Sequence, residues 1–156
     1  MAPIAIVLHT MVGTLAAADS WFGMAVSQVS AHYGVSLGGV VHQYVRLADA
    51  AWANGIAEPG PGYAWPGPAG VNPNLLSVAI ETEDLGSTTQ PVTDAQYDAV
   101  LALCGALVLP AWAGIRYLVA HRAITPVDKP HCPGDRWLAS GRFAQLAAAL
   151  GLTEIS

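Results

Sequence analysis

The sequence predicts an α/β domain in which a mixed central β-sheet is flanked by helices. Short, β-rich apolar runs alternate along the chain with segments of helical periodicity. The chain has 156 residues, 53% of them hydrophobic and only 11% charged, which suits one compact domain with a sizeable core. We therefore expect a single domain over residues 1–156, since this length leaves no room for a second module of ordinary size.

The N-terminal elements begin with an apolar run over residues 4–9, I-A-I-V-L-H. Such a run is typical of a buried central strand, and it ends in His9. Sites in open α/β sheets commonly lie at the carboxyl ends of strands, so His9 is well placed for a functional role. The next predicted elements are a helix and the two strands of a hairpin, over residues 16–26, 30–36 and 40–45.

Residues 58–73, E-P-G-P-G-Y-A-W-P-G-P-A-G-V-N-P, contain too much proline and glycine for a helix or a strand to continue. We predict a loop. Its aromatic residues, Tyr63 and Trp65, could line a substrate groove, or they could pin the loop to the surface of the domain. We favour the second interpretation.

The following strand is predicted over residues 76–83, L-S-V-A-I-E-T-E. Because side chains alternate between the two faces of a strand, Glu81 and Glu83 share one face with Ser77 and Ala79. Two carboxylates on one face are candidates for acid–base chemistry, although either could be a solvated strand residue.

The C-terminal half begins with a capping box, in which Thr93 is the N-cap and Gln96 the third helical residue. It predicts a helix over residues 94–109, limited by Pro110. A β-rich run and a last amphipathic helix follow, over residues 116–120 and 135–150. The β-rich run is followed directly by His121.

Composition excludes several classes of function. The formal net charge is −5 and the chain has no cluster of Lys or Arg, which argues against nucleic acid as a partner. No apolar stretch reaches the ~18 residues of a membrane span. Residues 1–18 superficially resemble a signal peptide, but the first basic residue is Arg46 and the polar pair His9 and Thr10 interrupts the apolar run. We therefore expect no signal peptide.

The two cysteines have different expected roles. Cys104 lies in a helical pattern, where a small buried thiol is the simplest interpretation, and a disulfide with Cys132 is the less favoured alternative. Cys132 follows His121 closely, and together with His9 these residues offer two imidazoles and a thiolate. Three such ligands with a fourth position open to water are the usual arrangement of a catalytic zinc.

The remaining histidines are less easily placed. His131 adjoins Cys132, and consecutive residues in an extended turn point apart, so it is expected beside the site or on the surface. His32 and His42 fall on the predicted hairpin, where a structural or substrate-facing role is more probable than ligation.

The order of motifs along the chain resembles the type 2 N-acetylmuramoyl-L-alanine amidases. The motifs are A-I-V-L-H-T, V-S-A-H-Y-G-V, A-W-A-N-G, L-S-V-A-I-E-T-E, P-V-T-D-A-Q-Y-D-A-V, L-V-A-H-R-A-I-T-P and K-P-H-C-P-G-D-R-W. This zinc family includes the T7-lysozyme-like phage endolysins, the AmpD-like amidases and the peptidoglycan recognition proteins. The resemblance runs nearly from end to end and excludes only the Pro/Gly-rich loop.

The resemblance implies one Zn²⁺ per chain, held by His9, His121 and Cys132. It also implies hydrolysis of the amide between N-acetylmuramic acid and L-alanine in bacterial peptidoglycan. Glu81 matches the position of the catalytic glutamate in the AmpD-like branch. The catalytic tyrosine of the T7-lysozyme branch is replaced by Ala31, which leaves the glutamate as the better candidate for the proton carrier.

This sequence departs from the family pattern at two positions. Relatives carry a lysine or hydroxyl two residues before the third ligand, where this chain has Pro130, so Lys129 is the preferred oxyanion-stabilising residue and His131 the alternative. Many relatives have a histidine where this chain has Ala53, so Asn54 is predicted to replace a substrate contact. The predicted substrate-binding residues are His32, Asn54 and His131.

The favoured function is that of a phage endolysin or its catalytic domain, made in the host cytoplasm and acting on the cell wall after release. We expect a monomer without a separate wall-binding domain. One alternative is a non-catalytic peptidoglycan-binding module, although such modules typically lose the cysteine ligand. A less favoured alternative is a cysteine peptidase with Cys132 as its nucleophile, in which the cysteine would be expected to precede the histidine.

Overall fold

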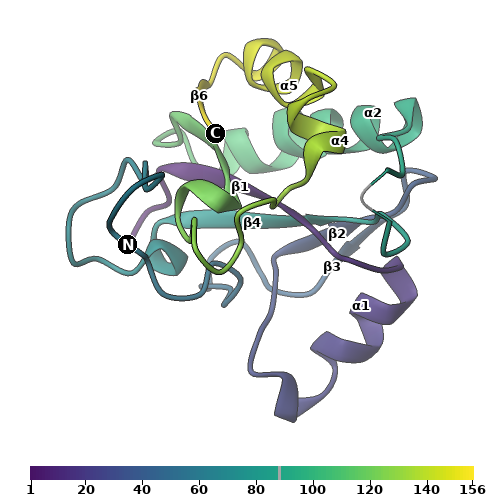
Figure 1. Ribbon diagram of the computed structural model, residues 1–156, viewed down its shortest axis with the longest axis horizontal. Helices are drawn as coiled ribbons and strands as arrows, with labels where there is room; N and C mark the ends of the chain where they lie inside the picture. The colour runs from purple at the N-terminus through teal and green to yellow at the C-terminus, as the bar shows by residue number, and fades with distance from the viewer. Residues whose placement is uncertain (88) are drawn as a thin grey trace.

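The computed structural model describes residues 1–87 and 89–156 (Figure 1). Among these residues, six strands form one mixed sheet in the order β3-β2-β4-β1-β5-β6. β1 (Ala5–Thr10) is central and runs parallel to β4 (Ser77–Thr82) on one side and β5 (Tyr117–Ala120) on the other. The predicted mixed α/β sheet is therefore confirmed.

The two edges of the sheet are short strands. β2 (Tyr33–Val35) pairs in parallel with β4 and antiparallel with β3 (Val41–Gln43), so the predicted hairpin is present with shorter strands. The other edge is β6 (Thr153–Ile155), parallel to β5, which the sequence analysis did not predict.

One face of the sheet is a closed apolar core. Ile6 and Leu8 of β1 point to this face, and alternation brings Val78, Ile80 and Leu118 to the same side. Its cover consists of α2 (Asp94–Leu103), α4 (Asp135–Leu138) and α5 (Arg142–Leu150), which lie together above the sheet in Figure 1.

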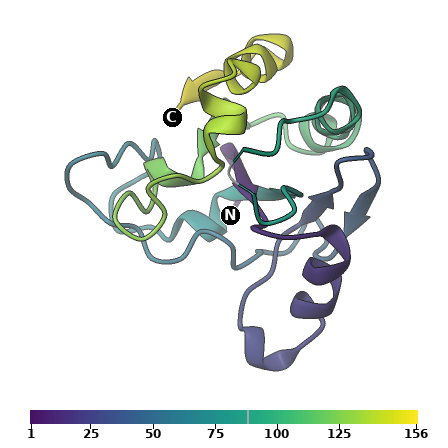
Figure 2. The ribbon, with the colours of Figure 1, turned by 45° about the vertical axis from the view of Figure 1, so that its right-hand side comes forward.

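The opposite face is covered in two parts. α1 (Leu15–Phe22) stands below the sheet, apart from the C-terminal helices, in both Figure 1 and Figure 2. Elsewhere the Pro/Gly-rich loop covers the face, because Trp65 is buried against Val7 and Val119. The predicted loop is thus pinned by its own aromatic residue, and it is followed by the short helix η2 (Pro73–Leu75).

Three predicted helices differ from the structure. The helix predicted over 16–26 ends at Phe22, because Gly23 caps it and Met24 is extended; a separate turn, η1 (Ala25–Ser27), follows. The helix predicted over 94–109 widens into a π-helical segment, η3 (Cys104–Val108), and continues as α3 (Leu109–Ala111). Pro110 lacks the N–H that an α-helix uses at each residue, and the widened turn directly before it accommodates this loss.

The last predicted helix, over 135–150, is two helices. Gly141 takes a left-handed conformation with φ of 78°, which ends the α-helical path between α4 and α5. Thr93 does cap α2, since its hydroxyl accepts from the Gln96 N–H at 3.1 Å. The Gln96 side chain turns instead to the sheet, where it donates to the carbonyl oxygens of Val35 and Glu83.

Across residues 1–87 and 89–156, no helix is both long enough and apolar enough to cross a membrane.

Candidate metal centre and active site

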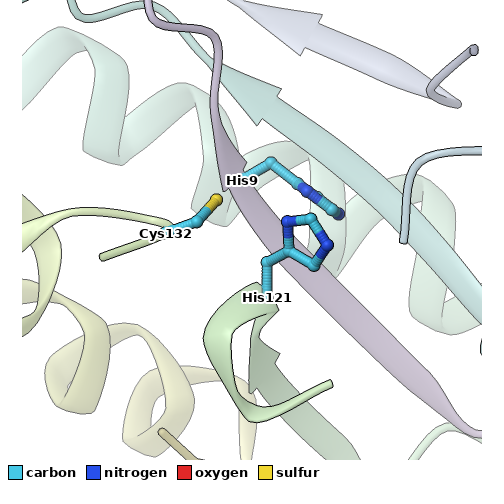
Figure 3. Close-up of side chains that lie close together, drawn as sticks. All are labelled: His9, His121 and Cys132. Atoms are coloured by element: carbon cyan, nitrogen blue, oxygen red, sulfur yellow. The ribbon is translucent and has the colours of Figure 1, made fainter. Parts of the chain in front are cut away.

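Three candidate metal ligands meet at the carboxyl ends of the central strands. His9 is near the end of β1, His121 opens the short helix η4 (His121–Ala123) after β5, and Cys132 lies in the loop before α4 (Figure 3). One donor atom from each of the three lies within 4.8 Å of the other two. The structure thus brings together the three ligands named from the sequence.

Sheet register explains this convergence. β1 and β5 are parallel, with Leu8 opposite Ala120. The residues that follow these two, His9 and His121, are therefore neighbours. Their ring centroids are 4.2 Å apart. The loop that carries Cys132 is tied back to the sheet, because the Thr10 N–H points at the Cys132 sulfur, with nitrogen and sulfur 3.4 Å apart.

The donor set fits zinc. Two imidazole nitrogens and a thiolate sulfur are ligands that zinc prefers, and three protein ligands leave a position for water. Burial lowers the pKa of His9 well below its usual value and lowers the pKa of His121 to about 4, so both rings are neutral and able to ligate. Burial raises the pKa of the Cys132 thiol, against the opposing effects of the Thr10 N–H and Lys129. A coordinated metal would remove this proton outright.

Glu81 is the carboxylate nearest to this centre. It lies opposite His9 in the β1–β4 register, and its Oε1 is 3.8 Å from His9 Nδ1. Its side chain is only 14% exposed, and burial raises its pKa to about 8, an effect that Lys129 opposes and Asp84 reinforces. Oε2 has no hydrogen-bond partner within the described part of the chain. A carboxyl group with these properties is suited to proton transfer near neutral pH.

Glu83, the competing carboxylate, has a structural role. Its Oε1 accepts from the Leu15 N–H at 3.2 Å and its Oε2 accepts from the Leu37 N–H at 2.8 Å. It therefore joins the start of α1 to the hairpin turn, and it does not line the cleft.

A cleft of about 1070 Å³ opens over the candidate metal centre. Lys129 and His131 are exposed and line it, so both remain available to an oxyanion. Lys129 lines the same cleft, and its positive charge acts to lower the pKa of His9, His121, Glu81 and Cys132.

The aromatic residues beside the cleft are not those singled out in the sequence. Trp21, Phe22 and Trp52 line it, whereas Tyr63 and Trp65 do not. Trp21 and Trp52 are about half exposed, at 47% and 51%. They could not be singled out from the sequence, because no local pattern marks a tryptophan as lying beside a site.

His32 was predicted to bind substrate, and the structure corrects this. The side chain is buried, its Nδ1 accepts from the Ala79 N–H at 3.0 Å, and its Nε2 lies 3.0 Å from the Asp49 carbonyl oxygen. Both ring nitrogens are thus used by main-chain groups, and His32 does not line the cleft. It links β4 to the segment after the hairpin.

Asn54 was also predicted to contact substrate, which stays a prediction: the residue is among those that line the cleft, and its side chain is directed at His9. Asn54 is fully buried, and its Oδ1 lies 3.1 Å from His9 Nε2. Its carbonyl oxygen lies 3.2 Å from His121 Nε2. The Asn54 amide therefore faces the two histidines, and it offers no exposed polar atom to a substrate.

Asp84 is a site residue that the sequence analysis missed. Its carboxylate accepts from the Thr10 hydroxyl at 2.6 Å and from the N–H groups of Gly13 and Gly86 at 2.8 and 2.9 Å. It thereby fixes the turn after β1 beside the cleft. The D-L-G sequence that follows β4 was a turn signal that could have pointed to it.

Comparison with known families decides what kind of protein carries this site. The model of the Amidase_2 family, described as N-acetylmuramoyl-L-alanine amidase, matches residues 1–135. The chain belongs to the N-acetylmuramoyl-L-alanine amidase family. Among curated proteins, no sequence matches it.

Solved structures of amidases have the same fold. The chain is similar to a selenomethionine derivative of AmpD at 27% identity, with a TM-score of 0.69 over 94% of this chain and 85% of that one. It is similar to AmiD from E. coli at 24% identity and to LysC from Clostridium intestinale at 18%, with TM-scores of 0.68 and 0.65. These matches cover 93% and 98% of this chain, and 57% and 88% of theirs. The predicted family and enzyme class, an N-acetylmuramoyl-L-alanine amidase acting on peptidoglycan, are confirmed.

Proposed function

We propose that this amidase is a zinc enzyme that hydrolyses the bond between the lactyl group of N-acetylmuramic acid and L-alanine. The observation that carries the proposal is the convergence of His9, His121 and Cys132 beside Glu81 in one cleft. The substrate class is supported by AmiD, which was solved with anhydro-N-acetylmuramic acid-L-Ala-D-gamma-Glu-L-Lys.

The residues of the cleft have three separate roles in this reaction. His9, His121 and Cys132 hold the ion, which when bound would lower the pKa of a water and polarise the amide carbonyl. Glu81 accepts the proton of the attacking water and delivers it to the leaving nitrogen, since it lines the cleft with its Oε1 3.8 Å from His9 Nδ1 and its pKa is raised to about 8. Lys129 places a positive charge beside the developing oxyanion.

The cysteine-peptidase alternative is not favoured by the site. A nucleophilic cysteine needs surroundings that lower the pKa of its thiol, whereas burial raises the pKa of Cys132. The alternative of a binding module without turnover is not favoured either, because the complete ligand set and an unpaired carboxylate are present.

We also propose that the enzyme acts on intact cell wall as a phage lysin, working as a monomer after release from the host cytoplasm. Support for this role comes from the sequence resemblance to phage endolysins. Aromatic side chains, those of Trp21, Phe22 and Trp52, also flank the cleft.

The test uses purified sacculi and a soluble anhydromuropeptide as parallel substrates. We expect stem peptides to be released without new reducing ends, activity to disappear with a chelator, and zinc at one ion per chain to restore it. Activity that survives exhaustive metal removal and is lost on thiol alkylation would support the cysteine peptidase. Activity on the soluble fragment alone would contradict the lysin role and leave the amidase chemistry standing.

A further inference from the structure

We propose that Asn54 is a positioning residue that holds both histidines of the metal centre in one tautomer, with a hydrogen on Nε2 and a bare Nδ1. Its side-chain oxygen lies 3.1 Å from His9 Nε2 and its main-chain oxygen 3.2 Å from His121 Nε2. One buried residue thus contacts two imidazoles from different elements, His9 in β1 and His121 in η4. The purpose of this arrangement rests on the proposed zinc chemistry, but the tautomers themselves do not require an ion.

The tautomer of His121 follows from the chemistry of its partner. The Asn54 carbonyl oxygen has no hydrogen to donate, so a hydrogen bond exists only if His121 Nε2 carries the hydrogen. A neutral imidazole has one such hydrogen, which leaves Nδ1 with a free lone pair. This nitrogen is then free to ligate.

The tautomer of His9 depends on which end of the Asn54 amide faces it, and Ser77 fixes that orientation. The Ser77 hydroxyl donates to the Pro73 carbonyl oxygen at 2.9 Å, so its oxygen is left as an acceptor. It accepts from Asn54 Nδ2 at 2.8 Å. A reversed amide would place an oxygen against a hydroxyl whose only hydrogen is already used. Oδ1 therefore faces His9, and His9 Nε2 must be the donor.

Asn54 is itself held in place by its neighbours. Its N–H and that of Ala53 both donate to Asn74 Oδ1, at 2.9 and 3.0 Å. Asn74 also donates to the Gly55 carbonyl oxygen at 3.2 Å. The segment that contacts the histidines is therefore fixed by Asn74 of η2 and Ser77 at the start of β4.

The consequence for metal binding is quantitative. Partners of the non-ligating nitrogen fix the tautomer and ring orientation of a metal-binding histidine, and their loss typically weakens metal affinity by about 10–100-fold. Asn54 does this for two ligands at once. Its substitution by alanine removes only the partner of His9, because the carbonyl that contacts His121 belongs to the main chain.

The first experiment reads the tautomers directly in metal-free protein. Histidine is labelled with ¹⁵N, and two-bond ¹H–¹⁵N correlation spectra near neutral pH report which ring nitrogen carries the hydrogen. We expect Nε2–H for both histidines in the wild type. In Asn54→Ala we expect His9 to become a mixture of tautomers and His121 to stay Nε2–H, so that His121 serves as the control within the same molecule.

The second experiment measures zinc affinity by competition with a chelator. We expect Asn54→Ala to bind zinc about 10–100-fold more weakly, and Ser77→Ala to lose less, because the amide remains but is free to reverse. Ser30→Ala is the matched control. The Ser30 hydroxyl accepts from the N–H of Trp52, two residues before Asn54, at 3.1 Å, but it forms no hydrogen bond with His9 or His121 in the described residues. Its zinc affinity should equal that of the wild type.

Several results would overturn the inference. An Nδ1–H signal from either histidine in the wild type would do so, as would an unchanged His9 spectrum in a folded Asn54→Ala variant. If Asn54→Ala does not fold, as judged by circular dichroism, the wild-type spectrum and the Ser77→Ala variant decide. A wild type that shows both Nε2–H tautomers but binds no zinc would defeat the proposed zinc chemistry and leave the tautomer assignment supported.

Discussion

Two regions on the same face of the sheet use the same residue types in opposite ways. At the candidate metal centre, His9 and Glu81 are largely buried and line a cleft, and Glu81 has a buried carboxylate oxygen with no partner in the described residues. Beside the hairpin, His32 and Glu83 have every ring nitrogen and carboxylate oxygen engaged by main-chain groups. The side chains are buried in both regions. What distinguishes the candidate active site is a polar side-chain atom that has no hydrogen-bond partner within residues 1–87 and 89–156.

The physical reason lies in the backbone around each region. The start of α1 and the hairpin turn leave the N–H groups of Leu15 and Leu37 without partners inside a helix or strand, and Glu83 accepts from both. The Ala79 N–H of β4 is satisfied by His32 Nδ1. At the ends of β1 and β4 the ladder continues through His9 and Glu81, so their backbone needs nothing from their side chains. Those side chains are left free for chemistry.

The largest expected effect comes from removing a ligand at the metal centre. Cys132→Ser should lower kcat/KM for wall hydrolysis by at least about 10³-fold, because the metal supplies several kcal/mol of transition-state stabilisation. Zinc per chain should fall, while binding to sacculi is retained. The measurements are stem-peptide release, metal content and pull-down with sacculi. If a zinc-free Cys132→Ser protein turned over substrate at the wild-type rate, Cys132 would not be a ligand of a catalytic metal.

The two glutamates provide the sharpest contrast. Glu81→Gln should lower kcat by about 10²–10⁴-fold with zinc retained, as expected for loss of a general acid–base group. Glu83→Gln should leave kcat per folded molecule within about tenfold but lower the free energy of unfolding by about 1.5–3 kcal/mol, because the amide offers one acceptor oxygen for two N–H groups. Steady-state kinetics and urea denaturation of both variants measure this. An exchange of the two phenotypes would show that the roles are reversed.

A smaller effect separates the two residues proposed to face the oxyanion. Lys129→Met should reduce kcat about 10²-fold with little change in zinc affinity, as for loss of one oxyanion-stabilising group. His131→Ala should reduce kcat less than about tenfold, since no hydrogen bond of its side chain is seen among residues 1–87 and 89–156. If His131→Ala proves the more damaging substitution, the oxyanion assignment moves to His131.

The smallest effect concerns the structural histidine and pH. Burial lowers the pKa of His32, so the folded protein keeps it neutral while the unfolded chain binds a proton below about pH 6.5. Stability should therefore fall as pH decreases through this range, by at most about 1.4 kcal/mol per pH unit from this group. His32→Gln lacks this dependence, so the gap in unfolding free energy between wild type and variant should narrow from about pH 7.5 to about pH 5.5. Urea denaturation of metal-free protein measures it, and a widening gap would contradict the assignment.

Much of the fold was accessible from sequence because its strongest signals are local. The apolar run of β1, the alternation of β4 and the Thr93 cap each depend on a few consecutive residues, and each is present. β6 was missed because T-E-I is short and polar at an edge, and it becomes a strand only through its pairing with β5. The break at Gly141 was missed because one glycine within a helical pattern does not by itself reveal a left-handed residue.

The site was predicted less evenly. The order of motifs placed His9, His121 and Cys132 correctly together, since a resemblance over the whole chain carries long-range information that spacing lacks. The hydrogen-bond partners of His32 and Asn54 were not predicted, because they lie 17 to 67 residues away, as Asp49 and His121 do. Which polar atoms already have partners becomes visible only in the folded chain.

The central position of β1 has a consequence for how this protein folds. Ala5 pairs with Ser77 on one side and with Tyr117 on the other, so the two partners of β1 lie 72 and 112 residues further along the chain. Contacts this distant in sequence give a high contact order and slow folding. Until β4 has been synthesised, the apolar segment Ile6 to Leu8 has no partner strand, and during that time it is open to aggregation. His9 comes together with His121 and Cys132 only after β5 and the loop that follows it have formed, so this cluster is among the last parts of the molecule to assemble.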